Sequence, residues 1–350
     1  PYWSLQPPLQ EDDDKYLRKI PDMLGLNRSE QVAMGEFSRL SVIAARQAMA
    51  QAGLSAGDYD DLRAGAIIGT GIYGADAVDE SYRDILERGK KRAHILTVPR
   101  AMPGAPAGQV SIDLGLRGPV FGVASACTSD NHAIISAADQ IRLGRADVML
   151  AGGTEAAVSS LCIGAFATMK ALSTRNDAPQ EASRPFDRDR DGFVLAEGAA
   201  VVVLEDYEHA KARGAEILAE VVGYASSGDA HHIAAPDESG VGARNAMTWA
   251  LRDAELTPDQ IGYINAHGTS TPLGDAAEVR AVKDVFGDHA GKLAMSSTKS
   301  MTGHALGAAG GIESVAVVQA LRTGILPPTI NLHDPDEEFD IDLVPNEARD

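Results

Sequence analysis

"GPVFGVASACTSDNHAIISAADQIRLG", residues 118–144, predicts a buried strand that leads directly into a helix. Apolar and small residues fill its first part, and the second part has helical spacing that ends at Gly144. Three polar residues can cap this helix: Ser129, Asp130 and Asn131. Cys127 lies at the junction, where the partial positive charge of a helix N-terminus favours a thiolate. A buried structural cysteine is the alternative, and it is also our interpretation of Cys162.

The rest of the chain alternates helices with short apolar strands, which is typical of α/β proteins with buried sheets. In the first half we expect a helix over 38–54 and strands over 63–71, 118–127, 146–153 and 198–206. In the second half we expect the following order: strand 216–225, helix 242–256, strand 260–269, helix 275–287, strand 292–300 and helix 307–324. The repeated order predicts two related halves, residues 1–210 and 211–350.

Composition excludes several classes of protein. The formal net charge of −19 over 350 residues disfavours binding to nucleic acid or to an anionic membrane surface. No uncharged apolar run is long enough to predict a transmembrane helix, and the start of the chain lacks a signal-peptide pattern. Two cysteines cannot form a disulfide framework, so we predict a reducing, cytoplasmic location.

Two motifs suggest other functions. "GTGIYG" at 69–74 matches a dinucleotide-binding loop, but the acidic residue expected at the end of a following strand is missing. "DRDRDGFVLAEG" at 187–198 resembles a calcium loop, but its twelfth position is Gly198 instead of Glu. We therefore predict tight turns without nucleotide or metal. A nicotinamide-dependent oxidoreductase is the alternative from a different class of enzyme, and it is suggested by "GTGIYG" alone.

Polar residues at two strand ends in the second half suggest a site with Cys127. "NAHGTSTPLGD" places His267 at one strand end, and "SSTKSMTGHALGAAGG" places Lys299 and His304 at the next. The two histidines are 37 residues apart, which fits two strand ends at one edge of a sheet. Two histidines, a lysine and a cysteine at strand ends form a candidate catalytic site.

These motifs resemble the β-ketoacyl-acyl carrier protein synthases of the condensing-enzyme, thiolase-like superfamily, and most closely the elongating type II members. "ASACTSDNHAI", "HGTSTPLGD" and "STKSMTGHALGAAGGIES" carry the resemblance, together with "GLRGP" and the stretch around "RPFDRDRDGFVLAEGAAVVVLED". The resemblance implies a thiolase-like fold, in which two βαβ halves form α-β-α-β-α layers. It also implies decarboxylative Claisen condensation in fatty acid elongation.

The resemblance also implies residue roles. Cys127 accepts an acyl group, and its own N–H helps to bind the oxyanion. His267 and His304 donate hydrogen bonds to the malonyl thioester carbonyl. The remaining roles are charge and substrate binding: Lys299 supplies positive charge, Glu313 balances it, and Thr269 and Thr271 bind the pantetheine amides.

No resident cofactor is implied, because the phosphopantetheine of an acyl carrier protein carries the substrates. We expect this carrier to bind a basic patch formed by Lys90, Lys91, Arg92 and Lys170. A homodimer is implied by the resemblance alone.

The chain departs from the family pattern at Asp130, where glycine is usual. A carboxylate there opposes thiolate formation. We also expect a fragment that lacks an N-terminal strand and a C-terminal Gly-rich loop. The alternatives within this chemistry are a type II polyketide ketosynthase and an inactive condensing-enzyme subunit.

Overall fold

The computed structural model describes residues 25–350, so the part of the predicted first half before residue 25 lies outside it. Its larger sheet has the strand order β2-β1-β3-β4. The strands are β1 (Ala64–Gly69), β2 (Val120–Val123), β3 (Val148–Glu155) and β4 (Gly198–Glu205). β1 runs parallel to both β2 and β3, whereas β4 is antiparallel to β3. The carboxyl ends of β1, β2 and β3 therefore lie at the same edge of the sheet.

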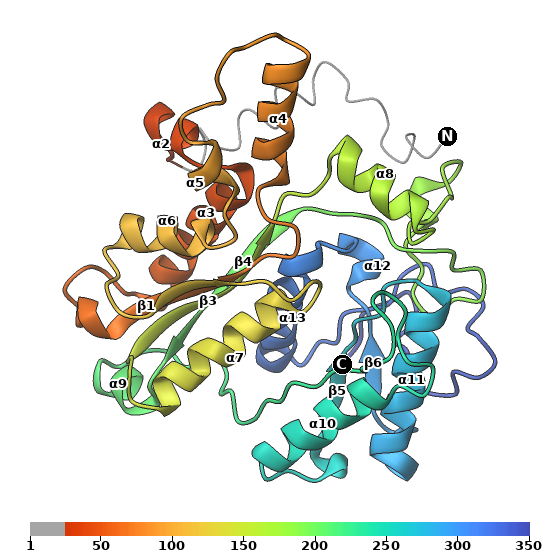
Figure 1. Cartoon of the computed structure of the whole chain (residues 1–350). Helices are drawn as coiled ribbons and strands as arrows, with labels where there is room; N and C mark the ends of the chain where they lie inside the picture. Colours follow the sequence, from red (N-terminus) through yellow and green to blue (C-terminus); the bar gives the residue numbers. More distant parts are fainter. Residues whose placement is uncertain (1–24) are drawn as a thin grey trace.

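Helices cover both faces of this sheet (Figure 1). On one face, α3 (Glu36–Ala52) and α6 (Ala105–Leu114) pack with β1 and β3 around Val42, Ile68 and Leu150. On the other face, α7 (Ser129–Arg142) packs against Ile67 and Met149 through small residues. Burial of these apolar side chains on both faces explains why the strands consist of continuous apolar runs.

The second half contains a parallel pair, β5 (Tyr263–Asn265) and β6 (Ala294–Ser296). α10 (Val241–Asp253) and α11 (Pro272–Phe286) pack beside it, around a core that includes Phe286 and Met295. α13 (Ala309–Thr323) contacts both β4 and β5 and so lies between the two sheets (Figure 1).

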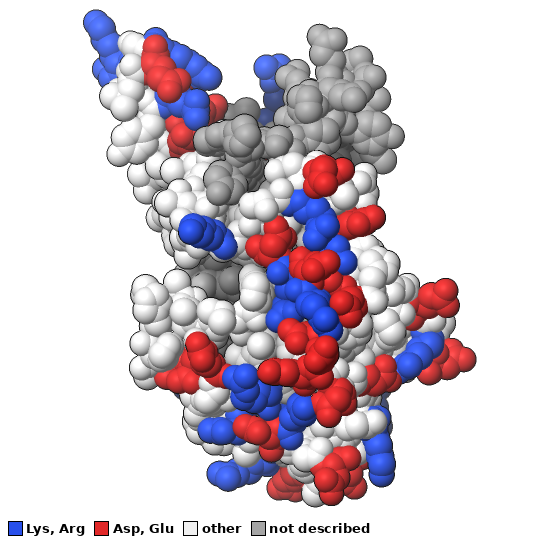
Figure 2. Space-filling model, turned by 90° about the vertical axis from the view of Figure 1, so that its right-hand side faces the viewer, with Lys and Arg blue, Asp and Glu red and all other residues white. Residues whose placement is uncertain are grey.

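Shorter helices complete the described part of the chain. They are α2 (Arg28–Ala33), α4 (Ala75–Leu86), α5 (Thr97–Ala101), α8 (Ser160–Thr168), α9 (Tyr207–Ala212) and α12 (Lys299–Thr302). Among residues 25–350, each helix is too short or too polar to span a bilayer. Acidic and basic side chains intermingle on the face shown in Figure 2.

Local signals placed most elements correctly. The helix expected over 38–54 is α3, and it ends where Gly53 adopts the left-handed conformation at φ 63°. The helix expected after Cys127 is α7, although its N-cap is Thr128, which makes no side-chain capping bond. The three expected capping residues lie inside the first turn instead.

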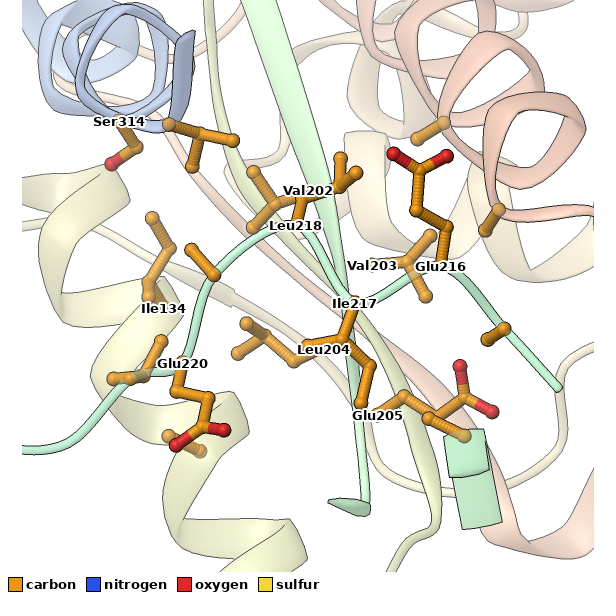
Figure 3. A pocket seen from close by; sticks show the side chains of 18 of the residues that line it. Ile134, Val202, Val203, Leu204, Glu205, Glu216, Ile217, Leu218, Glu220 and Ser314 are labelled. Carbon is orange, nitrogen blue, oxygen red and sulfur yellow. The ribbon is translucent and has the colours of Figure 1, made fainter. Parts of the chain in front are cut away.

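The strand predicted over 216–225 is absent, so this prediction is wrong. Residues 215–222 instead line one side of a groove of about 560 Å³, opposite β4, α7 and α13. In Figure 3, the segment that carries Glu216, Ile217 and Leu218 runs beside Val202, Val203 and Leu204. Its residues favour an extended chain, but a strand requires a hydrogen-bonded neighbour, and the described β5–β6 sheet has two strands only.

Candidate active site

Cys127 lies in a strained turn between β2 and α7. Ala126 has a φ of 54°, which is unusual for a residue with a side chain. The Ser129 hydroxyl accepts a hydrogen bond from the Ser125 N–H at 2.9 Å and donates to the Ala126 carbonyl at 2.6 Å. The Thr70 carbonyl, at 3.1 Å, is a further acceptor for this hydroxyl. These bonds fix the turn that presents the thiol.

The structure brings both candidate histidines to this thiol. His304 Nε2 lies 3.0 Å from Cys127 Sγ. Ligating atoms of Cys127, His267 and His304 all lie within 4.8 Å of one another, and the two imidazole rings meet edge to face at 5.3 Å. Residues from both halves of the chain thus form one site at strand ends, as the sequence predicts.

The surroundings of His304 determine where its ring proton sits. The Leu306 N–H donates to His304 Nδ1 at 3.3 Å, so Nδ1 is the unprotonated nitrogen of a neutral ring. The proton is therefore on Nε2, which faces Cys127. Phe193 packs edge to face on the ring at 5.1 Å, and the His304 backbone forms a bridge with Leu195. His304 is a positioned hydrogen-bond donor.

Both histidines are neutral at pH 7. Burial lowers the pKa of His304 well below its usual value, and His267 and Lys299 lower it further. Although His267 is exposed on one side, the protein packed around its ring, together with Lys299, lowers its pKa to about 3. A neutral imidazole keeps one N–H, which is the group that stabilises a developing oxyanion.

The expectation that Cys127 has a lowered pKa is wrong. Burial raises the pKa of its thiol to about 11, and nearby Glu155 and Asp130 add to the rise, while Lys299 and its own backbone N–H oppose it. The N-terminus of α7 stabilises a charge by at most about 2 kcal/mol, which corresponds to roughly 1.5 pKa units. Burial therefore outweighs the helix, and the resting group is a thiol.

Lys299 opens α12 directly after β6, and its ammonium group contacts the Glu313 carboxylate on α13. The Lys299 side chain is 2% exposed and that of Glu313 is 14% exposed. Burial raises the pKa of Glu313 to about 7, although Lys299 opposes this shift. The Lys299 ammonium group is thus held near the two histidines with a carboxylate beside it.

Sequence reasoning missed Glu278, which positions His267. Its two carboxylate oxygens accept the backbone N–H groups of His267 and Gly268 at 2.7 and 2.8 Å. Glu278 lies on α11 in the run "DAAEVRAVKD", where charges of both signs are typical of a solvated helix face. The hydroxyls of Thr269 and Thr271, in the loop between His267 and α11, pair with each other at 2.9 Å.

Cys127, His267 and His304 are the described residues that come closest to a metal site. Thiolate and imidazole would suit zinc. However, metal at His304 Nε2 requires a proton on Nδ1, where the Leu306 N–H already donates. The positive charge of Lys299 also disfavours a cation. The group is better suited to donating hydrogen bonds to a substrate.

The two misleading motifs have structural explanations. In "GTGIYG", the N–H groups of Gly71 and Ile72 donate to the buried Glu155 carboxylate, which occupies the donors a phosphate would need. In the second motif, Asp187 accepts hydrogen bonds from Arg184 and from the backbone of Asp189, His333 and Asp334. Both stretches are turns held by internal carboxylates.

The remaining predicted residues lie on the surface or in the core. Lys90, Lys91 and Arg92 are exposed between α4 and α5, where Lys90 pairs with Asp84 at 2.6 Å. Lys170 is exposed just after α8. Cys162 is a free, buried cysteine packed in an apolar cluster that also touches Cys127.

Comparisons with known proteins show what the chain is similar to. The beta-ketoacyl synthase N-terminal domain matches residues 17–210, and the C-terminal domain matches residues 218–333. The chain is 51% identical to nodulation protein E of Rhizobium leguminosarum bv. trifolii, covering 95% of this chain and 81% of that protein. It is 50% identical to 3-oxoacyl-acyl-carrier-protein synthase 2 of Coxiella burnetii, covering 89% and 76%.

A solved structure is also similar. It is the complex of a type II polyketide synthase acyl carrier protein with its ketosynthase, bound to a hexaketide. The TM-score is 0.86 at 38% identity, and the match covers 91% of this chain and 80% of the solved chain.

Proposed function

The chain belongs to the beta-ketoacyl synthase family, and we propose on that premise that Cys127, His267, His304 and Lys299 are its catalytic residues. Its reaction is the condensation of an acyl group with malonyl-acyl carrier protein, as in fatty acid elongation. The substrates are carried on phosphopantetheine, so the chemistry needs no resident cofactor. The observation that carries the residue assignment is the 3.0 Å contact between His304 Nε2 and the Cys127 sulfur.

In the first step, the Cys127 sulfur attacks the acyl thioester carbonyl. The bond from the carbonyl to the pantetheine sulfur breaks, and the Cys127 proton leaves with that sulfur. The Cys127 N–H helps to bind the developing oxyanion. The apolar cluster around Phe166 and Phe193, which touches Cys127, can hold the acyl chain.

In the second step, the malonyl unit loses CO2, and its electron pair forms an enolate on the thioester. His267 and His304 donate hydrogen bonds to that oxygen, and Lys299 adds positive charge. The enolate carbon then attacks the acyl group on Cys127, and the Cys127 sulfur leaves. The hydroxyls of Thr269 and Thr271 are the proposed partners of the pantetheine amides, and Glu313 balances the charge of Lys299.

Intact-protein mass tests this function. After incubation with a medium-chain acyl carrier protein, wild type should gain one acyl group and Cys127→Ala should gain none. Malonyl-acyl carrier protein should then release a β-ketoacyl product, detected by mass. A folded wild-type chain that gains no acyl group would instead be an inactive subunit.

The carrier protein is the proposed partner at Lys90, Lys91, Arg92 and Lys170. Exposed cations on a chain of net charge −19 are suited to an acidic partner through local attraction. Reversing the charge at Lys91 and Arg92 should raise KM for the carrier and leave kcat unchanged, whereas Lys292→Glu, a control on another exposed segment, should change neither. An equal KM in wild type, the charge-reversed variant and Lys292→Glu would show that these cations do not bind the carrier protein.

We also propose a homodimer through the edge of the larger sheet. β2 is the edge strand, and Phe121 on it is 41% exposed. Three more apolar side chains are exposed in the segment before β2. They are Val98 on α5, Met102 just after α5 and Ile112 on α6. Phe121→Lys should shift the molar mass measured by light scattering from dimer to monomer. A wild-type monomer would refute the proposal.

Two further proposals come from the sequence. We place the boundary between two halves near residue 210, because each half contributes parallel strands and part of the site. We also propose a cytoplasmic location, which the two free cysteines support.

A further inference from the structure

Glu155 is a fully buried carboxylate at the end of β3 that has no role in the proposed chemistry. One oxygen accepts the Thr70 hydroxyl at 3.1 Å and the Ile72 N–H at 3.2 Å. The other accepts the N–H groups of Gly71 at 2.7 Å and Gly307 at 3.0 Å. All four donors are uncharged, so this carboxylate is a connector between two loops and not half of an ion pair.

The loops that Glu155 joins are packed backbone against backbone. A Cβ on Gly307 would lie 2.2 Å from the Gly71 nitrogen, and a Cβ on Gly71 would lie 2.8 Å from a Glu155 oxygen. The first loop follows β1 and also contacts the nucleophile turn, because Thr70 lies 3.1 Å from the Ser129 hydroxyl. The second loop follows His304 and contains Leu306, whose N–H sets the tautomer of His304.

Asp130 fixes the same segment a few residues later. It is fully buried in the first turn of α7, where one oxygen accepts the Asn131 N–H at 2.8 Å. The other accepts the Gly311 N–H at 2.5 Å, in the first turn of α13. The segment from His304 to Glu313 is therefore held at residues 307 and 311 by two carboxylates from the nucleophile half.

We propose that Glu155 and Asp130 are positioning residues that together form a carboxylate clamp, which holds the 304–313 segment so that His304 Nε2–H points at the reacting centre. This inference rests on the proposed function. The clamp acts through the Leu306 N–H, and it touches neither substrate nor the reacting atoms. It joins the two halves where the hydrogen-bond donor meets the nucleophile.

The clamp also has an electrostatic cost. Its two negative charges help to raise the pKa of Cys127, and desolvation raises the pKa of Asp130 to about 6. The clamp thus places His304 well while it disfavours the Cys127 thiolate. Removing the charge of Glu155 should therefore change the two half-reactions in opposite directions, which general damage to the fold would not do.

The test compares wild type, Glu155→Gln and Asp130→Asn. Acylation of Cys127 by medium-chain acyl carrier protein is followed by mass across a pH series. Condensation is measured as single-turnover product formation from acylated enzyme and malonyl-acyl carrier protein. In Glu155→Gln, condensation should fall roughly ten- to a hundred-fold, as expected for a misplaced catalytic group, while the acylation profile moves to lower pH. Asp130→Asn should likewise lower condensation and move the acylation profile to lower pH.

The control is Glu205→Gln, at the end of β4, whose carboxylate bonds Arg213 and His209 away from the site. It should leave both half-reactions unchanged. An equal fall of acylation and condensation in a folded Glu155→Gln protein, or no fall in condensation, would overturn the clamp. If Glu155→Gln does not fold, Asp130→Asn decides by the same criterion. Failure of wild type to condense would refute the proposed function instead.

Discussion

His304 Nε2 lies 3.0 Å from Cys127 Sγ, although 177 positions separate the two residues in the chain. The strand end before α7 supplies the thiol, and a bridge to Leu195 fixes the backbone of His304. The Leu306 N–H then leaves the imidazole proton on the nitrogen that faces the sulfur. The two side chains can be tested separately, Cys127 as the nucleophile and His304 as the hydrogen-bond donor.

His304→Ala should retain acylation of Cys127 and lose condensation by about 10²–10³-fold, the usual effect of removing one oxyanion donor. Mass measures acylation, and single-turnover product formation measures condensation. Cys162→Ala should keep both steps, because Cys162 is a buried packing residue. Wild-type condensation by His304→Ala would refute the donor role.

The thiol should react slowly at neutral pH. Burial raises the pKa of Cys127 to about 11, so the thiolate fraction, and with it the alkylation rate by iodoacetamide, should rise about ten-fold per pH unit and show no plateau up to about pH 10. A free thiol in solution, as a control, should level off near its own pKa of about 8.5. A plateau for Cys127 below pH 8 would contradict the effect of burial.

Lys299 and Glu313 should be strongly coupled in stability. Lys299→Met leaves a buried carboxylate without its partner and should lower the free energy of unfolding by about 3–5 kcal/mol. Adding Glu313→Leu should recover most of that loss, but condensation should stay low because the positive charge is gone. Urea unfolding measures the stability, and additive losses in the double variant would argue against the pair.

Glu278→Gln should lower condensation through His267. The new NH2 group faces one of two backbone donors, so a buried N–H loses its acceptor, at a cost of about 1–3 kcal/mol. Product formation and thermal unfolding should both fall. Glu255→Gln, at an exposed position after α10, is the matched control and should match wild type. Full activity in Glu278→Gln would show that His267 needs no such support.

Asp275 should make stability depend on pH. Burial raises its folded-state pKa from 3.8 to about 7, so the folded state binds this proton more tightly than the unfolded state does. The free energy of unfolding should therefore fall as pH rises from about 4 to 7. In Asp275→Asn this slope should be smaller by one proton, as measured by urea unfolding across pH. An unchanged slope would show that Asp275 is ionised in the fold throughout.

The sequence predicted the elements that depend on local signals. Gly53 ends α3 because glycine adopts positive φ readily, and the apolar run before Glu155 forms β3 because both of its faces are buried. Strand-end positions were also enough to place His267, Lys299 and His304 in one site with Cys127. The segment 216–225 was misassigned because strand formation depends on a partner that local propensity does not reveal.

By itself, the sequence determined the family, the α/β architecture and the set of reactive side chains, since these follow from motif order and apolar periodicity. Only the tertiary structure decided their chemical state. The pKa of Cys127 rises because packing removes water from the thiol, an effect stronger than that of the helix N-terminus. The roles of Glu155, Asp130 and Glu278 were likewise hidden, because their donors are backbone groups distant in sequence, and only folding brings them within hydrogen-bond distance.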